Sequence, residues 1–396
     1  MDASGQSPRI LVIRAGAIGD TLMTTPLVRA LRQRFPDGSL SFLCSRAAHD
    51  VLRHNLHLDR VIPLTYRHLP AWLSREKLRL ARELCRLDLD WALVLESHSS
   101  FLELARRSGA RRVVAYGEPA GHSLPQGFQL AYFDPEKHSI ENHLRAAAPL
   151  GVEPSGPQSL EPQERAMELY YPAVLDAAVR ERLAGAGVAD GDLLVGIHAG
   201  WGGESRRGSR RQALEDTRLR SWPPGRFAEV ARWLAEQAGA RIVLTGAAAD
   251  QPLTEFIAQQ SKMACLNFAG KLSLLELAAL IRRLDVYLTV DSGPAHMAAA
   301  LGTPLVTLWG PGILEQTRPL AGRGPVRLLY KRVHCAPCYG TPLVKSCQDN
   351  ICMKQIEVAE VVEAVGNMLA GTQASRAGRT SRASEAGASE SIRARS

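Results

Sequence analysis

The stretch Leu284–Gly310, LDVYLTVDSGPAHMAAALGTPLVTLWG, decides the expected fold. Val286–Val290 is a short apolar run of the kind that forms a buried strand. Small residues follow it, and Ala295–Leu301 has the composition of a short helix that Gly302 ends. A second apolar run, Pro304–Trp309, completes a strand–helix–strand unit. This order predicts two neighbouring strands of a parallel sheet.

The turn that opens this helix has the features of a phosphate-binding loop. Ser292 is a candidate N-cap, Gly293 has no side chain, and Pro294 suits the first helical position. His296 stands in the first turn. A helix N-terminus without bulky side chains presents N–H groups and the positive end of a dipole, which suit a phosphate. The pattern suits an ordinary turn of a parallel sheet equally well, so both interpretations stay open.

The start of the chain repeats the same order of elements. The apolar run Arg9–Ile13 is followed by a loop containing Gly16 and Gly19, and then by the helical pattern of Thr21–Arg34. Two glycines fall short of the full G-x-G-x-x-G signature, so a dinucleotide site is weakly supported. Asp20 is the carboxylate of this loop, and it suits either a helix N-cap or a general base directed into a cleft.

The remaining chain alternates between apolar runs and helical patterns. We expect further strands at 40–44, 60–64, 91–95, 112–115, 193–198, 241–245 and 265–268. This alternation predicts an α/β protein with two Rossmann-like domains, each on a parallel sheet, and a ligand in the cleft between them.

The expected domain boundary lies near Tyr171. Residues 117–138 lack a periodic pattern, which predicts a loop. Residues 151–172 contain four prolines, which predicts a linker with one edge strand. We therefore expect an N-terminal domain over 1–171 and a C-terminal domain over 172–370. Residues 371–396 are rich in Gly, Ser, Ala and Arg, which predicts a disordered basic tail.

Composition restricts the class of protein. The 396 residues are 45% hydrophobic and 22% charged, which is typical of a soluble globular protein. No apolar run approaches the roughly 18 residues of a membrane span, and the first residues lack the layout of a signal peptide. Seven cysteines, an odd number, favour a reducing compartment over a disulfide framework. We expect a cytoplasmic protein.

The net charge of +8 is concentrated in two places. The tail has five arginines and two glutamates, and residues 1–100 have fourteen Arg and Lys against ten Asp and Glu. Such an excess suits an acidic partner, or serves only to solubilise the surface. Nucleic acid is the weakest candidate partner, because no platform of interleaved aromatic and basic residues is present.

Four cysteines lie close together in the sequence: Cys335, Cys338, Cys347 and Cys352. Thiolates at such positions are able to ligate Zn²⁺. The spacing fits no standard zinc knuckle, however, so packed thiols or oxidation-prone pairs are favoured and neither a metal nor a cofactor is expected.

Four segments together resemble one known family. They are RILVIRAGAIGDTLMTTPLVRALR (9–32), IHAG (197–200), RSWPPGRFAEVARWL (220–234) and VDSGPAHMAAALGTPLVTLWGP (290–311). The chain resembles glycosyltransferase family 9, the lipopolysaccharide heptosyltransferases, and the cysteine-bearing segment ending at Cys352-Met353 is similar to many members.

The resemblance implies a GT-B fold, with the acceptor held by the first domain and the sugar nucleotide by the second. It also implies transfer of heptose from ADP-heptose to a lipopolysaccharide core acceptor, with inversion and without a metal. The family's base lies in the Gly-Asp pair after the first strand, which corresponds here to Gly19 and Asp20.

The resemblance also assigns residues to the donor. Arg220 takes the place of the basic residue before the Trp-Pro pair and would bind the diphosphate, together with the amides of Ser292 and Gly293. Asp291 would meet sugar hydroxyls, and His296 either bonds near the diphosphate or is simply packed. The remaining donor residues would flank the nucleoside: Thr245, Gly246 and Asp250.

One departure from the family and two alternative functions remain. The loop 204–220 is long and contains six arginines, any of which is able to bind the phosphates. The chain is alternatively a family member that uses another nucleotide-sugar on another surface glycan, or a non-catalytic nucleotide-sugar-binding protein. The expected acceptor is lipid-linked and phosphorylated, with weak, salt-sensitive contact to the anionic inner membrane.

Overall fold

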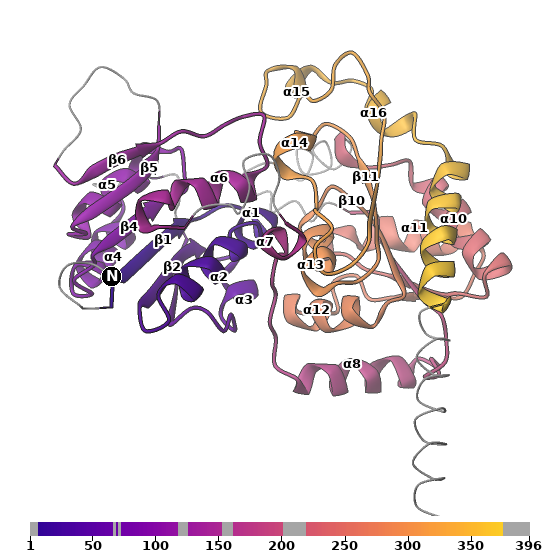
Figure 1. Cartoon of the computed structure of the whole chain (residues 1–396). Coiled ribbons are helices and arrows are strands. Elements are labelled where there is room, and N and C mark those ends of the chain that lie inside the picture. The colour runs from indigo at the N-terminus through magenta and orange to yellow at the C-terminus, as the bar shows by residue number, and fades with distance from the viewer. Residues whose placement is uncertain are drawn as a thin grey trace, which may run out of the picture.

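The computed structural model describes residues 7–65, 69, 73–117, 126–152, 161–200 and 219–374. They form two α/β units, each built on a six-stranded sheet, which stand side by side in Figure 1. In the described part of the chain, no helix is both long and apolar enough to cross a membrane.

The first unit has its first strand in the centre of the sheet. The sheet order is β3-β2-β1-β4-β5-β6, and neighbouring strands are parallel. Its strands are β1 (Arg9–Arg14), β2 (Ser39–Ser45), β3 (Arg60–Leu64), β4 (Trp91–Val94), β5 (Arg112–Tyr116) and β6 (Phe128–Ala131). Its helices are α1 (Ile18–Leu22), α2 (Thr25–Arg34), α3 (His49–Leu52), α4 (Arg75–Cys85), α5 (Ser99–Arg107), α6 (Ser139–Ala146) and α7 (Pro162–Arg165).

Strand β1 is covered by helices on both faces of the sheet. Ile10 and Val12 belong to the buried cluster that includes α2 and α6, whereas Leu11 and Ile13 pack with α4 and α5. A parallel strand buried on both sides needs a continuous apolar run rather than an alternating one. This is why the sequence of β1 shows no alternation.

The second unit repeats this plan. Its sheet order is β12-β11-β10-β7-β8-β9, again parallel throughout. The strands are β7 (Leu194–His198), β8 (Arg241–Leu244), β9 (Cys265–Asn267), β10 (Val286–Val290), β11 (Leu305–Trp309) and β12 (Val326–Tyr330). The helices are α8 (Val174–Gly185), α10 (Pro224–Gln237), α11 (Gln251–Ser261), α12 (Leu274–Arg283), α13 (Gly293–Leu301), α14 (Leu314–Thr317), α15 (Leu343–Ser346), α16 (Ile351–Lys354) and a last helix over 358–374.

The strand–helix–strand unit expected at 284–310 is present as β10, α13 and β11. Val286 and Leu288 point to the side of the sheet that α10 covers, and Tyr287 joins the cluster of α12 and α13 on the other side. Gly302 ends α13 with a φ of +79°, a left-handed conformation that glycine adopts without strain.

Some predicted elements were wrong or incomplete. The edge strands β6 and β12 were not predicted, and no strand occurs in the described residues 161–172, where an edge strand was expected. The last helix continues to residue 374, past the predicted start of the tail at 371. The rest of the tail (375–396) and most of the Arg-rich loop (201–218) lie outside the described residues.

The two units are joined by a buried ion cluster around Glu168, whose side chain is 4% exposed. Its carboxylate lies 3.0 Å from Arg29 of α2 and 3.1 Å from His57. On the other side it lies 2.8 Å from Arg323, which precedes β12 in the second unit. Glu168 therefore links the two units through ion pairs.

Candidate active site

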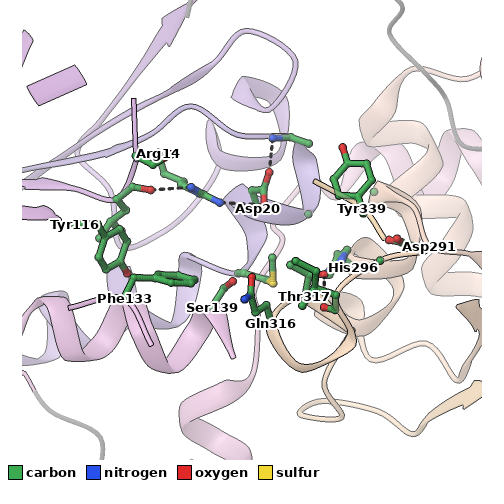
Figure 2. A pocket seen from close by; sticks show the side chains of 18 of the residues that line it. Arg14, Asp20, Tyr116, Phe133, Ser139, Asp291, His296, Gln316, Thr317 and Tyr339 are labelled. Carbon is green, nitrogen blue, oxygen red and sulfur yellow. Dashed lines mark hydrogen bonds and ion pairs between the residues drawn. The ribbon is translucent and has the colours of Figure 1, made fainter. Parts of the chain in front are cut away.

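A cleft of about 660 Å³ lies between the two units. Figure 2 shows side chains of both units that line it. The first unit contributes Arg14, Asp20, Tyr116, Phe133 and Ser139, and the second contributes Arg220, Asp291, His296, Gln316, Thr317 and Tyr339. Most of these residues follow the carboxyl ends of parallel strands, where α/β proteins bind ligands.

The two glycine-bearing turns pack directly against each other at this cleft. A Cβ atom on Gly19 would lie 2.6 Å from Cδ2 of His296, and one on Gly293 would lie 3.2 Å from Cβ of Ile18. Helices α1 and α13 are therefore able to meet only because both positions lack a side chain. This close contact brings helix α1, which carries Asp20, to the N-terminus of α13.

Asp20 is both a helix-capping residue and a residue of the cleft. Its Oδ2 accepts a hydrogen bond from the Ala17 N–H at 2.9 Å, and its Oδ1 accepts one from Nη2 of Arg14 at 3.0 Å. A carboxylate has about four acceptor positions, so two bonds leave capacity for a third. The side chain keeps 32% of its surface exposed, toward the cleft.

The surroundings keep Asp20 ionised. Burial alone would raise its pKa, but the Arg14 guanidinium, the Ala17 N–H and His296 together hold the pKa of this carboxyl below its ordinary value. A carboxylate that is charged at neutral pH is able to accept a proton.

Arg220 and Asp291 face each other across the second unit's side of the cleft. Nη1 of Arg220 lies 3.0 Å from Oδ2 of Asp291, and each side chain is 11% exposed. The guanidinium also stacks on the ring of Tyr339, 4.1 Å from its centroid. Burial raises the pKa of Asp291, while Arg220 opposes that shift. A cation is thus held in place at the cleft.

The N-terminus of α13 is open toward this cation. Ser292 occupies the N-cap position, but its side chain makes no capping bond, and its Oγ instead lies 3.0 Å from Oγ1 of Thr289. Pro294 is in the first turn, as predicted. His296 is buried, and burial lowers its pKa to about 4, so the ring is neutral at pH 7. Neutral His296 and the helix dipole suit a phosphate at this position.

The residues expected around the nucleoside lie elsewhere in the second unit. Thr245 is buried after β8, and its Oγ1 lies 2.8 Å from the Tyr287 hydroxyl and 3.0 Å from Nδ1 of His198. Asp250 is buried as well and accepts a bond from the Ala247 N–H at 2.8 Å. Gly246 packs on Asp250, and none of these three residues lines the described cleft.

The cysteine segment supports the cleft from outside. The N–H groups of Cys338 and Tyr339 both donate to the Pro311 carbonyl, which places the Tyr339 ring over Arg220. Burial raises the pKa of Cys338 and of Cys352, so both are thiols at neutral pH. Across the residues that the structure describes, no three His, Cys, Asp or Glu side chains are arranged to hold a metal ion.

Sequence reasoning missed several residues of the cleft. Arg14 ends β1 and was read only as part of a motif, and Tyr116 ends β5 with its ring edge-on to Phe133, 5.2 Å between centroids. The position at the end of a strand was the available signal for Arg14 and Tyr116. Tyr339 and Gln316 carried no such signal, because Tyr339 lies in a segment without regular structure and Gln316 lies in the short helix α14.

The comparisons with known proteins agree with this geometry. Residues 215–344 match the model of glycosyltransferase family 9 (heptosyltransferase). The lipopolysaccharide heptosyltransferase 2 of Salmonella typhimurium is 26% identical over 338 residues, which cover 82% of this chain and 89% of that protein. The lipopolysaccharide heptosyltransferase 2 of Escherichia coli K12 is 24% identical, with the same coverage.

Solved structures show the same fold. A glycosyl transferase family 9 protein from Veillonella parvula superposes with a TM-score of 0.76 at 20% identity, over 92% of this chain and 98% of that one. The E. coli ADP-heptose lps heptosyltransferase II superposes with a TM-score of 0.69 at 21% identity, over 92% and 99%. The expected GT-B arrangement of two Rossmann-like units is therefore confirmed.

Proposed function

We propose that this chain is a member of glycosyltransferase family 9 and transfers heptose from ADP-heptose to a lipopolysaccharide core acceptor. The observation that carries the proposal is the composition of the cleft. One unit supplies an ionised carboxylate, Asp20, and the other supplies a cation, Arg220, beside an open helix N-terminus. These are the groups that an inverting transfer from a nucleoside diphosphate sugar requires.

In the proposed reaction Asp20 removes the proton of the acceptor hydroxyl. The acceptor oxygen then forms a bond to the anomeric carbon on the face opposite the diphosphate, whose C–O bond breaks, so the configuration inverts. Arg220 and the N–H groups of α13 stabilise the negative charge that develops on the departing ADP. With these groups in place we propose that no metal ion is needed, and that activity persists in a chelator.

Asp291 and the nucleoside residues have supporting parts in this proposal. Asp291 lies 3.0 Å from the Arg220 guanidinium, and we propose that it also contacts sugar hydroxyls at the same cleft. The side chains of Thr245 and Asp250 are bonded within the fold and Gly246 packs on Asp250, so these three residues would support the nucleoside site from behind the residues that line the cleft.

The first test is calorimetric binding of ADP, UDP and GDP to the whole protein and to Arg220→Ala. We expect ADP to bind most tightly, and the substitution to weaken it by about tenfold or more, since a charge-assisted contact is lost. Preference for UDP or GDP would keep the transferase but change the donor. Absence of binding to all three would refute the catalytic proposal.

We propose further that the acceptor is lipid-linked and phosphorylated, and that the basic first hundred residues bring the enzyme to an anionic membrane surface. Co-flotation with vesicles containing anionic lipid should occur at low salt and decline as salt is added. Equal behaviour with neutral vesicles would contradict this part of the proposal.

A further inference from the structure

Asp20 is one end of a row of three charged side chains at the carboxyl ends of β1 and β4. Nη2 of Arg14 bonds to Asp20 at 3.0 Å, and Nη1 of the same guanidinium bonds to the Leu95 carbonyl at 2.7 Å. Glu96 lies on the far side, with Oε1 3.7 Å from Nη1 of Arg14. Arg14 therefore stands between two carboxylates.

The Glu96 end of this row is held at the edge of the sheet. Oε1 of Glu96 accepts a hydrogen bond from the Ala15 N–H at 2.7 Å, which ties the end of β4 to the end of β1. The two strands are paired directly up to Ile13 and Val94, immediately before the charged residues. The side chains of Arg14 and Glu96 are 19% and 15% exposed, so solvent screens them little.

We propose that Arg14 is a positioning residue that aims the Asp20 carboxylate, and that Glu96 retains Arg14 after Asp20 has taken the proton. This inference rests on the proposed role of Asp20 as general base. When the acceptor proton moves to Asp20, that carboxyl becomes neutral and its attraction for Arg14 falls. Glu96 takes no part in the proton transfer, so the guanidinium keeps a carboxylate beside it and its bond to Leu95 through the step.

The charged groups around Asp20 determine how substitution of Arg14 or Glu96 should change the pKa of Asp20. Arg14 faces it from β1, His296 from α13 and Asp291 from the end of β10. Glu96 acts on it through Arg14, beside which Tyr116 also lies. Removing the Arg14 charge should raise the pKa of Asp20, because only the Ala17 N–H and His296 then still oppose the effect of burial. Removing the Glu96 charge alone leaves Arg14 paired with Asp20, so the pKa of Asp20 should not rise.

The experiment is the pH profile of kcat/KM with ADP-heptose and a truncated lipopolysaccharide acceptor. We expect Arg14→Met to shift the acidic limb of the profile to higher pH and to lower kcat at pH 7 by about 10- to 100-fold. Glu96→Gln alone should lower kcat without moving the acidic limb to higher pH, and in the Arg14→Met background it should lower kcat no further, because no guanidinium is left to retain. Arg14→Gln, which removes the charge but keeps a donor for Leu95, is the second variant should Arg14→Met fail to fold.

Two controls separate positioning from stability. Arg14→Lys keeps the charge, so the limb should stay near its wild-type position while kcat falls. Arg32→Met removes another largely buried arginine of the same unit, which bonds Asp59 and the His57 and Gly38 carbonyls away from the cleft. It should lower the melting temperature without moving the limb.

The outcomes distinguish this inference from the proposed function. Full activity of Asp20→Asn would refute the role of Asp20 and this inference with it. An inactive Asp20→Asn, together with an Arg14→Met profile that keeps the wild-type limb, would overturn the positioning role alone. A wild-type kcat in Glu96→Gln, or the same loss of kcat from Glu96→Gln with and without Arg14, would overturn the part assigned to Glu96.

Discussion

Gly19 shows how one residue controls the contact between the two units. Its Cα lies against the His296 ring, where an added Cβ would lie 2.6 Å from a ring carbon. His296 is fully packed and sits in the first turn of α13, so it has little room to move. A side chain at position 19 must therefore push α1 and the adjoining Asp20 away from the donor side of the cleft.

We predict that Gly19→Ala lowers the free energy of unfolding by about 1–3 kcal/mol, the usual cost of overpacking, and reduces kcat more than ADP binding. Thermal unfolding, calorimetry and turnover measure the three effects. Gly225→Ala in α10 is the matched control, because its Cβ meets nothing within 4 Å. Equal behaviour of the two variants would contradict the contact described here.

Asp20 illustrates what the sequence is able to predict about a site residue. Its position in a glycine-bearing loop allowed two roles, cap or base, and the structure shows that it caps the Ala17 N–H while remaining at the cleft. Its partner Arg14 was not singled out, because charge pairing across a turn leaves no periodic signal. Arg220 was singled out through the family resemblance, but its pairing with Asp291 depends on tertiary contacts.

At the scale of elements, α6 is the helix that connects the first unit to the second. His138 caps it: Nδ1 accepts from the Ile140 N–H at 3.2 Å, and Nε2 donates to the Arg318 carbonyl of the other unit at 2.9 Å. Gln316 of α14 adds a second bridge, since its side chain donates to the Pro135 carbonyl at 2.9 Å. These bonds close one side of the cleft.

Burial lowers the pKa of His138 and of His296 to about 4, and it lowers the pKa of His143 well below its ordinary value. In the unfolded chain a histidine has a pKa of about 6.5, so the unfolded state binds more protons between about pH 6.5 and 4. Stability is therefore complete above about pH 6.5 and is lost as the pH falls, by up to about 1.4 kcal/mol per pH unit for each histidine.

We predict that denaturant midpoints fall between pH 7 and pH 5, and that His138→Asn makes this fall smaller. Asparagine retains an N-cap acceptor for α6 but does not titrate. A midpoint that is the same at both pH values, or an unchanged pH dependence in His138→Asn, would show that these histidines are not held neutral by the fold.

The elements that the sequence predicted well are those with two buried faces. Strands β1 and β10 are continuous apolar runs, and helix α13 is bounded by a turn and Gly302, so local pattern and tertiary position agree. The edge strands β6 and β12 are only partly buried, and their residues mix polar and apolar types. They exist because a neighbouring strand supplies hydrogen bonds, which is information that local sequence does not contain.

At the scale of the whole molecule, the arrangement of the units depends on Glu168. Its carboxylate is buried between Arg29 and His57 on one side and Arg323 on the other. We predict that Glu168→Gln lowers the free energy of unfolding by about 1–3 kcal/mol, because the largely buried Arg29 and the partly exposed Arg323 lose the counter-charge that they share. Denaturant unfolding measures this loss.

The matched control is Glu103→Gln on α5, where the carboxylate pairs with Arg106 and Arg107 on the surface. Exposed pairs of this kind contribute little, so its loss should be far smaller. Similar losses in both variants would mean that Glu168 does not join the units energetically.

The central claim is that Asp20 removes the proton of the acceptor in an ADP-heptose-dependent transfer. The most direct test measures ADP release during turnover and ADP binding for the wild type and for Asp20→Asn. In this variant an uncharged amide of the same size replaces the carboxylate. The account predicts a loss of turnover of about 10²–10⁴-fold with ADP affinity nearly unchanged. Retained turnover, or loss of turnover that only follows lost ADP binding, would contradict it.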